Sequence, residues 1–303
     1  MKTVFNGAHT QHHGVELNDG VVMPCFEEPQ RAEFVLQQVK TSGLGEIVEG
    51  LSHDISNYTA VHSERYVEFL SQAWEEWVAS GFDNQALPLV WPRSGLRSDV
   101  EPQHIEGRLG FFAMDGGCSI GEGTWNAAQG SADTALTAVD LVLGGEHAAF
   151  ALCRPPGHHA ASSFMGGYCY LNNAAIAAQR AIADGMGRVA VLDVDFHHGN
   201  GTQEIFYDRS DVFFASLHGD PKVSYPYFLG HADEGGSGEG VGFNANYPLP
   251  PGTAWAEYSI ALDSAAGRLK AHAPELLVVS LGVDTFEGDP ISTFKLRSAD
   301  YLE

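Results

Sequence analysis

The chain has 303 residues, of which 44% are hydrophobic and 18% charged, and its net charge at pH 7 is −23. A chain of this length can bury a large core, and no apolar run approaches the roughly 18 residues that a transmembrane helix needs. The acidic excess disfavours nucleic-acid binding, because phosphate groups would be repelled. This charge either keeps the surface soluble or attracts a polycationic ligand, and the sequence leaves both explanations open.

The N-terminal sequence and the cysteines predict the cellular compartment. The stretch Met1–Asn6 lacks the continuous apolar core of a secretory signal peptide, which favours a cytoplasmic location without membrane attachment. The widely spaced cysteines form no C-x-x-C pair, which predicts reduced thiols and argues against a cysteine zinc site. These residues are Cys25, Cys118, Cys153 and Cys169.

Hydrophobic periodicity predicts helices and strands that alternate regularly from about residue 124 onward. The predicted helices are Pro29–Thr41, Ser63–Ser80, Trp125–Leu143, Leu171–Asp184 and Tyr258–Ala271. The predicted strands are Ala148–Cys153, Val189–Leu192, Asp211–Leu217 and Leu276–Leu281. Strands separated by helices are typical of β-α-β units, so we expect an α/β fold with a mostly parallel sheet covered on both faces.

The segment at about 81–123 mixes Pro, Gly, Ser, Trp and charged residues without a stable period. It is too long for an ordinary connection. We expect it to be an insertion, serving as a lid or a dimer contact, within a single domain that covers residues 1–303. An irregular but packed surface excursion is the alternative.

Two adjacent histidines follow the first strand of the alternating region. His158 and His159 come after Arg154-Pro155-Pro156-Gly157, and imidazole pairs suit acid–base chemistry near neutral pH. Ligand sites in open α/β sheets lie beyond the carboxyl ends of strands. We therefore expect this cluster to lie along one edge of one sheet with two further polar clusters.

The second cluster is Asp193-Val194-Asp195-Phe196-His197, directly after the strand Val189–Leu192. In an extended chain Asp193, Asp195 and His197 point to the same side. Burying them together is costly unless a cation or tight pairing neutralises them. Oxygen and imidazole ligands suit zinc, iron or manganese, and a hydrogen-bonded carboxylate cluster is the alternative.

The third cluster supplies Asp284, after the strand Leu276–Leu281, and Asp289-Pro290 nearby is interpreted as the start of a turn. Two carboxylates and one imidazole would leave a zinc ion with an open position for water and substrate. That arrangement is typical of a catalytic metal site.

Four motifs occur in a characteristic order: Arg-Pro-Pro-Gly-His-His, Gly-Gly-Tyr-Cys-Tyr-Leu-Asn-Asn, Asp-Val-Asp-Phe-His-His-Gly-Asn-Gly-Thr and Gly-Val-Asp-x-x-x-x-Asp-Pro. The chain in this respect resembles the histone deacetylase and acetylpolyamine deacetylase superfamily, and most of all the bacterial acetylpolyamine amidohydrolases. The resemblance covers nearly the whole chain. It implies a three-layer arginase/deacetylase-like α/β fold and zinc-dependent hydrolysis of acetamide bonds in acetylated polyamines or similar small acetylated amines.

The resemblance also implies roles for individual residues. The implied zinc ligands, with Fe²⁺ as an alternative metal in the cell, are Asp195, His197 and Asp284. His159 matches the general base and later acid, and His158 matches a histidine that gives electrostatic support. Asp193 and Asn200 match the residues that orient the first and the second histidine.

The family further binds potassium. The residues that match the inner K⁺ site are Asp193, Asp195, His197, Ser216 and Leu217. Those that match an outer site are Phe206, Arg209, Val212 and Phe243.

The implied substrate is a small cationic acetylated amine, bound in a tunnel of a homodimer. The residues that match the tunnel walls are Gly167, Tyr168 and Tyr225. Glu106 in the insertion is an acid that could meet a distal ammonium group. Relatives can carry another acid where this chain has Gly117, and Asp115 lies two residues away.

The family pattern continues with a glycine-rich segment that ends in a tyrosine, which donates to the developing oxyanion. The 303 residues stop at Tyr301-Leu302-Glu303 before that segment, and Tyr301 does not match its tyrosine. Loss of one oxyanion donor typically costs about 2.7–4 kcal/mol in the transition state. We therefore expect a fragment with its C-terminal part missing. A catalytically impaired binder of acetylated amines is the alternative.

Two enzymatic alternatives share this type of fold. The first is a lysine deacetylase that acts on proteins. The second is a ureohydrolase similar to arginase, which needs an Asp-x-Asp-x-x-Asp motif for a second metal. Phe286 occupies the middle position of that motif here, which argues against the second alternative.

Overall fold

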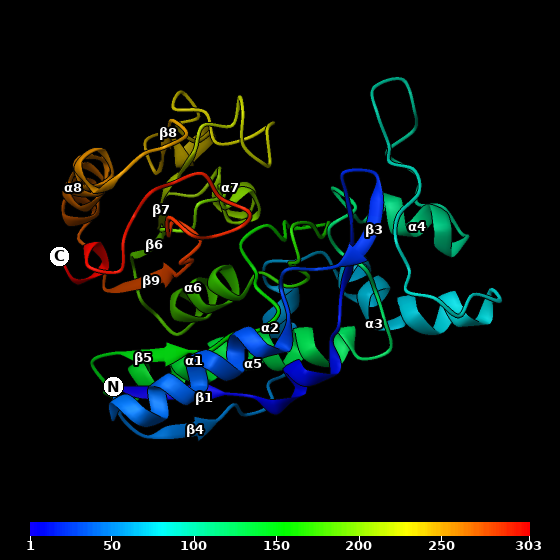
Figure 1. The fold of residues 1–303 in the computed structure, drawn as a ribbon, viewed down its shortest axis with the longest axis horizontal. Helices are drawn as coiled ribbons and strands as arrows, with labels where there is room; N and C mark the ends of the chain where they lie inside the picture. Colours follow the sequence, from blue (N-terminus) through cyan, green and yellow to red (C-terminus); the bar gives the residue numbers. More distant parts are fainter. The chain divides into compact units, whose positions relative to one another are not determined.

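The computed structural model describes residues 1–303, and the chain forms two compact units, Met1–Ala177 and Ala178–Glu303 (Figure 1). The first unit contains a parallel sheet in the order β4-β1-β5. Its strands are β1 (Lys2–Phe5), β4 (Ile47–Glu49) and β5 (Ala149–Ala151). Helix α5 (Thr124–Leu143) packs on β1 and β5 through a buried surface made mainly of Ala, Gly, Ser and Thr.

The rest of the first unit is a hairpin and several helices. Strands β2 (Val15–Asn18) and β3 (Val21–Pro24) pair antiparallel. Their turn is Asp19-Gly20, with φ of 50° and 79°, as hairpin turns of the Asp-Gly type require. The helices are η1 (Gly7–Gln11), α1 (Pro29–Ser42), α2 (Ser56–Thr59), α3 (Glu64–Ala79) and α4 (Ile105–Phe111).

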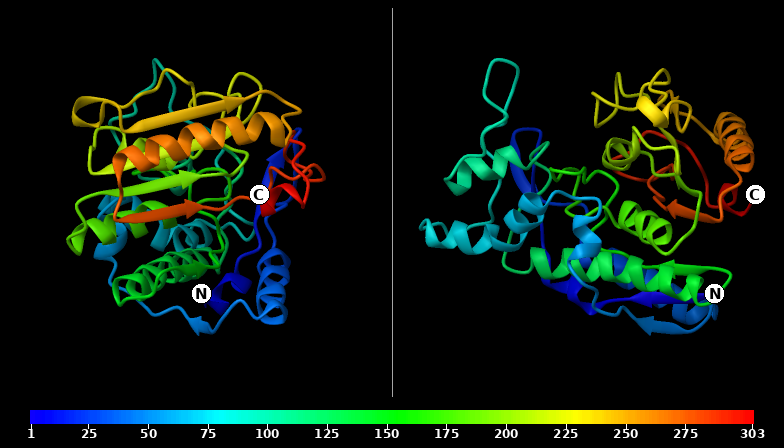
Figure 2. Two further views of the ribbon diagram at one scale, coloured as in Figure 1. Left: turned by 90° about the vertical axis from the view of Figure 1, so that its left-hand side faces the viewer. Right: turned by 180° about the vertical axis from the view of Figure 1, so that it is seen from behind.

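The second unit contains a parallel sheet in the order β8-β7-β6-β9, whose strands run side by side in the left view of Figure 2. They are β6 (Val189–Asp193), β7 (Val212–Gly219), β8 (Asn244–Leu249) and β9 (Leu276–Ser280). All eight residues of β7 are buried, because helices cover this strand on both faces. Helix α8 (Trp255–His272) packs on β7 and β8, and α7 (Asn200–Phe206) packs on β7 from the other face.

The remaining elements are one helix at the boundary between the units and two short 3₁₀ helices. Helix α6 (Asn173–Ala183) contains the boundary between the two units, and η2 (Gly238–Gly240) and η3 (Asp300–Leu302) are single 3₁₀ turns. No helix of the chain combines the length and the apolar character needed to span a membrane.

All the predicted helices and strands are present, with ends that differ by at most a few residues. The α/β class with parallel sheets is therefore confirmed. The expectation of one sheet for all three polar clusters is wrong in this structure. Strand β5 hydrogen-bonds to β1 in a separate sheet, whereas β6 and β9 pair with each other. Periodicity predicts where a strand lies but not its partner.

The aromatic core next to the end of β6 allows a test of the packing in the second unit. Phe294 is completely buried, with its ring 4.7 Å from that of Phe196 and 6.2 Å from that of Tyr258. Phe294→Ala should lower the free energy of unfolding by about 3–5 kcal/mol, because such truncations lose transfer energy and leave a cavity. Urea unfolding would measure this. Val241→Ala, at a position 66% exposed, is the matched control. A loss below about 1 kcal/mol at Phe294 would contradict the packing described.

Candidate metal centre and its surroundings

The candidate metal centre forms where β6 and β9 end. The strands pair in parallel with Asp193 opposite Ser280, so that the chain leaves both strands at the same edge of the sheet. The next residues of each segment bring Asp195, His197 and Asp284 together. One ligand atom from each of the three lies within 4.8 Å of the other two. The three predicted zinc-ligand residues therefore form one cluster.

Hydrogen bonds hold the cluster together. His197 Nδ1 lies 2.8 Å from Asp284 Oδ2 and 3.2 Å from Asp195 Oδ1. The other Asp284 oxygen accepts the backbone N–H of Phe196 at 2.8 Å, and Asp195 Oδ1 accepts the N–H of His197 at 2.8 Å. Two backbone amides thus fix the carboxylates relative to the chain that carries them.

Glycine is required at two places around the cluster. A Cβ atom at Gly282 would lie 2.1 Å from Asp195 Oδ2, and one at Gly199 would lie 2.3 Å from Asp193 Oδ2. Neither distance is compatible with a side chain. The backbone therefore approaches both carboxylates more closely than any other residue type would allow.

The electrostatics of the cluster fit a cation. Burial alone would lower the pKa of His197, but hydrogen bonds to Asp195 and Asp284 outweigh it and raise the pKa to about 10. Burial and the nearby Asp195 raise the pKa of Asp284 to about 6. Two nearly buried carboxyl groups thus draw a proton onto the imidazole. This donor set of two oxygens and one nitrogen without thiolate suits a divalent ion such as zinc.

The tandem histidines belong to the first unit, on the turn that follows β5. The rings of His158 and His159 lie 4.0 Å apart between centroids, and the two residues are only 8% and 3% exposed. Gly167, with φ of 50°, packs directly on His159, since a Cβ there would lie 2.2 Å from the ring atom Cδ2. Asp115 accepts the backbone N–H of Gly167 at 3.0 Å. The predicted tunnel-wall residue Gly167 therefore restrains His159.

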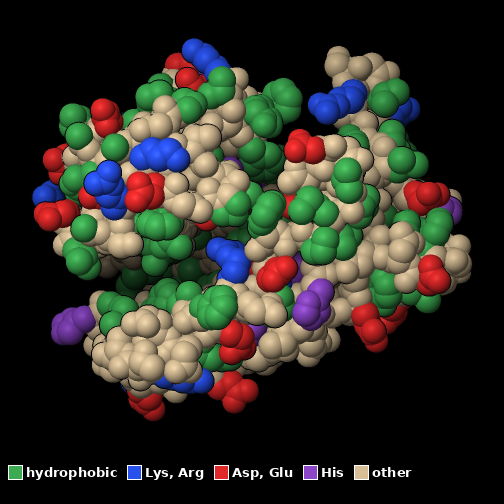
Figure 3. Space-filling view, viewed as in Figure 1, with side chains coloured by type: hydrophobic (Ala, Val, Ile, Leu, Met, Phe, Trp, Pro, Cys, Tyr) green, Lys and Arg blue, Asp and Glu red, His purple; other side chains and the backbone are tan.

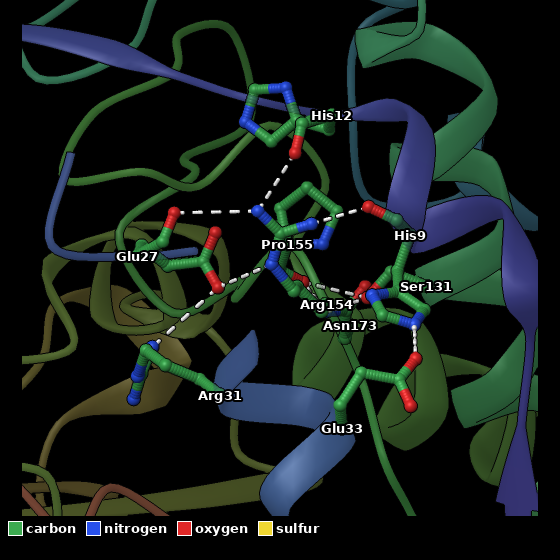
Figure 4. Close-up of polar contacts among 9 residues, drawn as sticks. All are labelled: His9, His12, Glu27, Arg31, Glu33, Ser131, Arg154, Pro155 and Asn173. Atoms are coloured by element: carbon green, nitrogen blue, oxygen red, sulfur yellow. Dashed lines mark hydrogen bonds and ion pairs between the residues drawn. The ribbon is translucent and has the colours of Figure 1, made fainter. Parts of the chain in front are cut away.

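A buried ion pair anchors the start of this turn (Figure 4). Arg154 Nε donates to Glu27 Oε1 at 2.9 Å, and both residues are at most 4% exposed. The other guanidinium nitrogens donate to the backbone oxygens of His9 and His12. Removing one partner of such a buried pair destabilises the fold by about 3–5 kcal/mol, because the other charge is left uncompensated. Arg154 thus ties the segment before the histidines to residues near the N-terminus.

His62 is a site residue that the sequence analysis missed. Its Nδ1–H donates to Ala161 O at 2.8 Å, and its Nε2 accepts the N–H of Asn172 at 2.9 Å. Asn172 Nδ2 in turn donates to Ala160 O at 2.9 Å. His62 and Asn172 therefore hold the two residues that follow the tandem histidines. A lone histidine before a helix carries no motif, so only its contacts identify it.

The predicted substrate-binding residues lie in different surroundings. Tyr225 belongs to the second unit, and its ring lies 5.9 Å from that of His197 at 75°. Tyr168 has a φ of 68° and donates its hydroxyl to Glu16 at 2.7 Å. Glu106 lies in the first turn of α4 with its side chain 46% exposed, and its Oε2 is 3.6 Å from His104 Nδ1. The structure brings Tyr225 beside the candidate metal centre, whereas Glu106 lies partly exposed in α4.

The residues matched to potassium occupy both ends of the second sheet. Asp193 pairs in register with Ser216, and both are fully buried, as is Leu217. Val212 begins β7 at the opposite end of this strand. The Arg209 guanidinium lies 5.1 Å from the centre of the Phe206 ring, and the backbone oxygens of Phe206 and Phe243 accept N–H groups.

Asn200, the residue matched to the partner of the second histidine, begins α7 and is 1% exposed.

Comparison with known proteins shows to which protein family the chain belongs. A model of the histone deacetylase domain matches residues 25–303. Acetylpolyamine amidohydrolase 2 of Pseudomonas aeruginosa is 53% identical over 303 residues, which cover 100% of this chain and 88% of that protein. The acetylpolyamine amidohydrolase of Mycoplana ramosa is 46% identical over 303 residues, 100% of this chain and 89% of that one. The chain therefore belongs to the histone deacetylase family.

A solved structure supports the same assignment. The crystal structure of acetylpolyamine aminohydrolase from Burkholderia pseudomallei matches with a TM-score of 0.94 at 39% identity, covering 99% of this chain and 87% of that chain. The family resemblance and the fold class predicted from the sequence are both confirmed. The protein is an enzyme of the hydrolytic deacetylase class.

The buried His62 beside the tandem histidines predicts how the free energy of unfolding depends on pH. Burial lowers the pKa of His62 from 6.5 to about 4, so the folded state favours the neutral ring. Its contribution to stability is therefore fully present above pH 6.5 and is lost as the pH falls toward 4. The loss amounts to about 3 kcal/mol for a shift of this size.

His62→Gln should accordingly flatten the fall of the unfolding free energy between pH 6.5 and 4, measured by urea unfolding at several pH values. The exposed His13 gives the matched control, His13→Gln, which should keep the wild-type slope. An unchanged slope in His62→Gln would show that the ring is not held neutral.

Proposed function

We propose that this protein hydrolyses the acetamide bond of acetylated polyamines or similar small acetylated amines, with a metal ion held by Asp195, His197 and Asp284. The observation that carries the proposal is the convergence of these three side chains within 4.8 Å at the end of β6 and β9. Full-length similarity to acetylpolyamine amidohydrolases supports the choice of substrate class.

Zinc is the proposed metal, and Fe²⁺ is the alternative in the cell. When bound, the metal ion would act as a Lewis acid that polarises the acetamide carbonyl and lowers the pKa of a bound water molecule. The open arrangement of two carboxylates and one imidazole leaves room for water and substrate. Potassium is proposed as a second type of ion, at the two sets of residues named for it above.

The tandem histidines perform the proton transfers in this proposal. His159 accepts a proton from the attacking water and returns it to the leaving amine as the carbon–nitrogen bond breaks, giving acetic acid and the free amine, which at neutral pH exchange a proton to become acetate and ammonium. His158 gives electrostatic support. Asp193 and Asn200 orient the first and the second histidine. The close packing of Gly167 on His159 would hold the base in one orientation.

Substrate selection is proposed to depend on aromatic walls and acidic groups. Tyr168 and Tyr225, with Gly167, would line a tunnel for the alkyl chain, because aromatic faces also attract ammonium groups. The insertion at about 81–123, with Glu106, would act as a lid or as the contact of a homodimer. Acidic side chains are spread over the face in Figure 3 and do not form one patch there. That distribution supports a solubilising role for the charge of −23.

The proposed substrate class predicts an order of catalytic efficiencies. The value of kcat/KM for acetylputrescine and acetylspermidine should exceed that for an acetyl-lysine peptide by on the order of tenfold or more. N-pentylacetamide, which has the shape of acetylputrescine without its ammonium group, is the matched control and should react more slowly. A preference for the peptide would favour a protein lysine deacetylase. Absence of turnover with metal bound would favour a binding protein.

The proposed general base predicts a separation of activity from metal binding. His159→Ala should reduce kcat by about 10²–10⁴-fold, the usual contribution of a positioned base, and should keep about one zinc ion per chain, because the metal ligands are untouched. Steady-state kinetics and elemental analysis measure the two quantities. His147→Ala, at an exposed position, is the control. Undiminished activity in His159→Ala would exclude this residue as the base.

A further inference from the structure

The loop that follows β7 carries Tyr225 toward the metal centre. This loop, residues 220–235, is called the Tyr225 loop below. Its first part is fixed by backbone bonds, since Asp220 N–H donates to Leu249 O and Ser224 N–H donates to Asp220 O, at 2.8 and 2.9 Å. Tyr225 itself lies with its ring 5.9 Å from that of His197. The position of this ring therefore depends on how the rest of the loop is held.

One carboxyl group holds the far end of the loop. Glu234 Oε2 accepts the backbone N–H of Gly230 at 2.9 Å, Gln203 Nε2 at 2.7 Å and Asn246 Nδ2 at 3.1 Å. The backbone oxygen of Glu234 accepts Asn244 Nδ2 at 2.6 Å. Glu234 thus joins the loop to α7, which contains Gln203, and to β8, which contains both asparagines.

The same anchor reaches the residue next to the metal ligand. Gln203 Oε1 and Asn246 Oδ1 lie 3.1 and 3.2 Å from His198 Nε2, and His198 directly follows His197. The two side-chain amides that bind the Glu234 carboxyl group, Gln203 and Asn246, are therefore also the amides that contact His198. One polar network connects the end of the loop with the metal-binding segment.

The loop packs tightly on this network at Gly230. The oxygen of Gly230 accepts His218 Nε2–H at 2.8 Å. A Cβ at Gly230, whose φ is 107°, would lie 2.8 Å from His218 Nε2 and 2.9 Å from His198 Cγ. The backbone of the loop thus packs against the imidazole rings of His198 and His218, whose centroids lie 4.5 Å apart at an angle of 60°, with no space for a side chain.

We infer that Glu234 is a positioning residue for substrate binding, which fixes the Tyr225 loop and thereby sets the place of the Tyr225 ring beside the metal centre. The inference rests on the function proposed above, in which Tyr225 lines the tunnel for an acetylated alkylamine. Without the carboxyl group, the Gly230 N–H and the two amide donors lose their shared acceptor. The loop then loses its bond to α7 and keeps the bonds of its backbone oxygens to Asn244, Asn246 and His218, so that the Tyr225 ring is held less firmly.

A double-mutant cycle tests the inference on the zinc-loaded enzyme with acetylputrescine. Glu234→Ala should raise KM roughly tenfold, the change expected from losing one favourable contact with substrate, while kcat stays within about twofold of wild type. Glu234→Gln keeps an acceptor oxygen and should stay close to the wild-type KM. In a Tyr225→Ala background, Glu234→Ala should raise KM no further, because Glu234 acts through that ring.

Hydrogen exchange gives a readout that does not require turnover. Peptides that cover 220–235 should exchange faster in Glu234→Ala and at the wild-type rate in Glu234→Gln. The exposed neighbour Asp233 provides the control, since Asp233→Ala also removes an acid from the loop. If Glu234→Ala does not fold, Glu234→Asp takes its place with the same expectations, because its carboxyl group is one methylene short of the three donors.

Additive effects of Glu234→Ala and Tyr225→Ala on KM would overturn the inference. A loss confined to kcat would also do so, as would unchanged KM and exchange in Glu234→Ala. If the wild-type enzyme turns over no acetylated amine, the proposed function fails instead. The exchange rates of 220–235 then still decide whether Glu234 anchors the loop.

Discussion

The parallel pairing of β6 with β9 is the constraint on which the candidate site depends. It places Asp193 opposite Ser280 and sends both following segments out at one edge of the sheet. The backbone at Gly282 then passes so close to Asp195 that a Cβ would lie 2.1 Å from its carboxyl oxygen. Asp284 follows two residues later and reaches His197. The three side chains meet because the strands are neighbours, although they are far apart in the sequence.

Two charged side chains, the buried Arg154 in the first unit and the partly buried Glu234 in the second, each hold a segment of the chain through several hydrogen bonds. Arg154 donates to Glu27 and to backbone oxygens in the first unit, and Glu234 accepts N–H groups from three segments in the second. The Arg154 guanidinium thus contacts oxygen acceptors, and the Glu234 carboxylate contacts N–H donors. A buried charge is stable only with such partners. Within each unit, a polar network therefore holds the segment concerned in addition to apolar packing.

Much of the fold could be predicted from the sequence, because β6, β7 and β9 are apolar runs and α5 has a helical period. The convergence of Asp195, His197 and Asp284 could also be predicted, since an alternating Asp-x-Asp-x-His pattern directly follows one strand and Asp284 follows another. The separate sheet of β5 could not, because periodicity does not identify a strand's partner. His62 and Glu234 were missed for a related reason. Each is a single polar residue outside any motif, and its partners are distant in the sequence.

Metal analysis tests the central claim most directly, which is that Asp195, His197 and Asp284 together hold one zinc ion. The purified protein, loaded with zinc and dialysed, should retain about one ion per chain, as a site with three protein ligands does. Asp284→Asn should lose most of this zinc, while Asp289→Asn in the same segment should keep it. Wild-type zinc content in Asp284→Asn, or no bound zinc in the unaltered protein, would contradict the account.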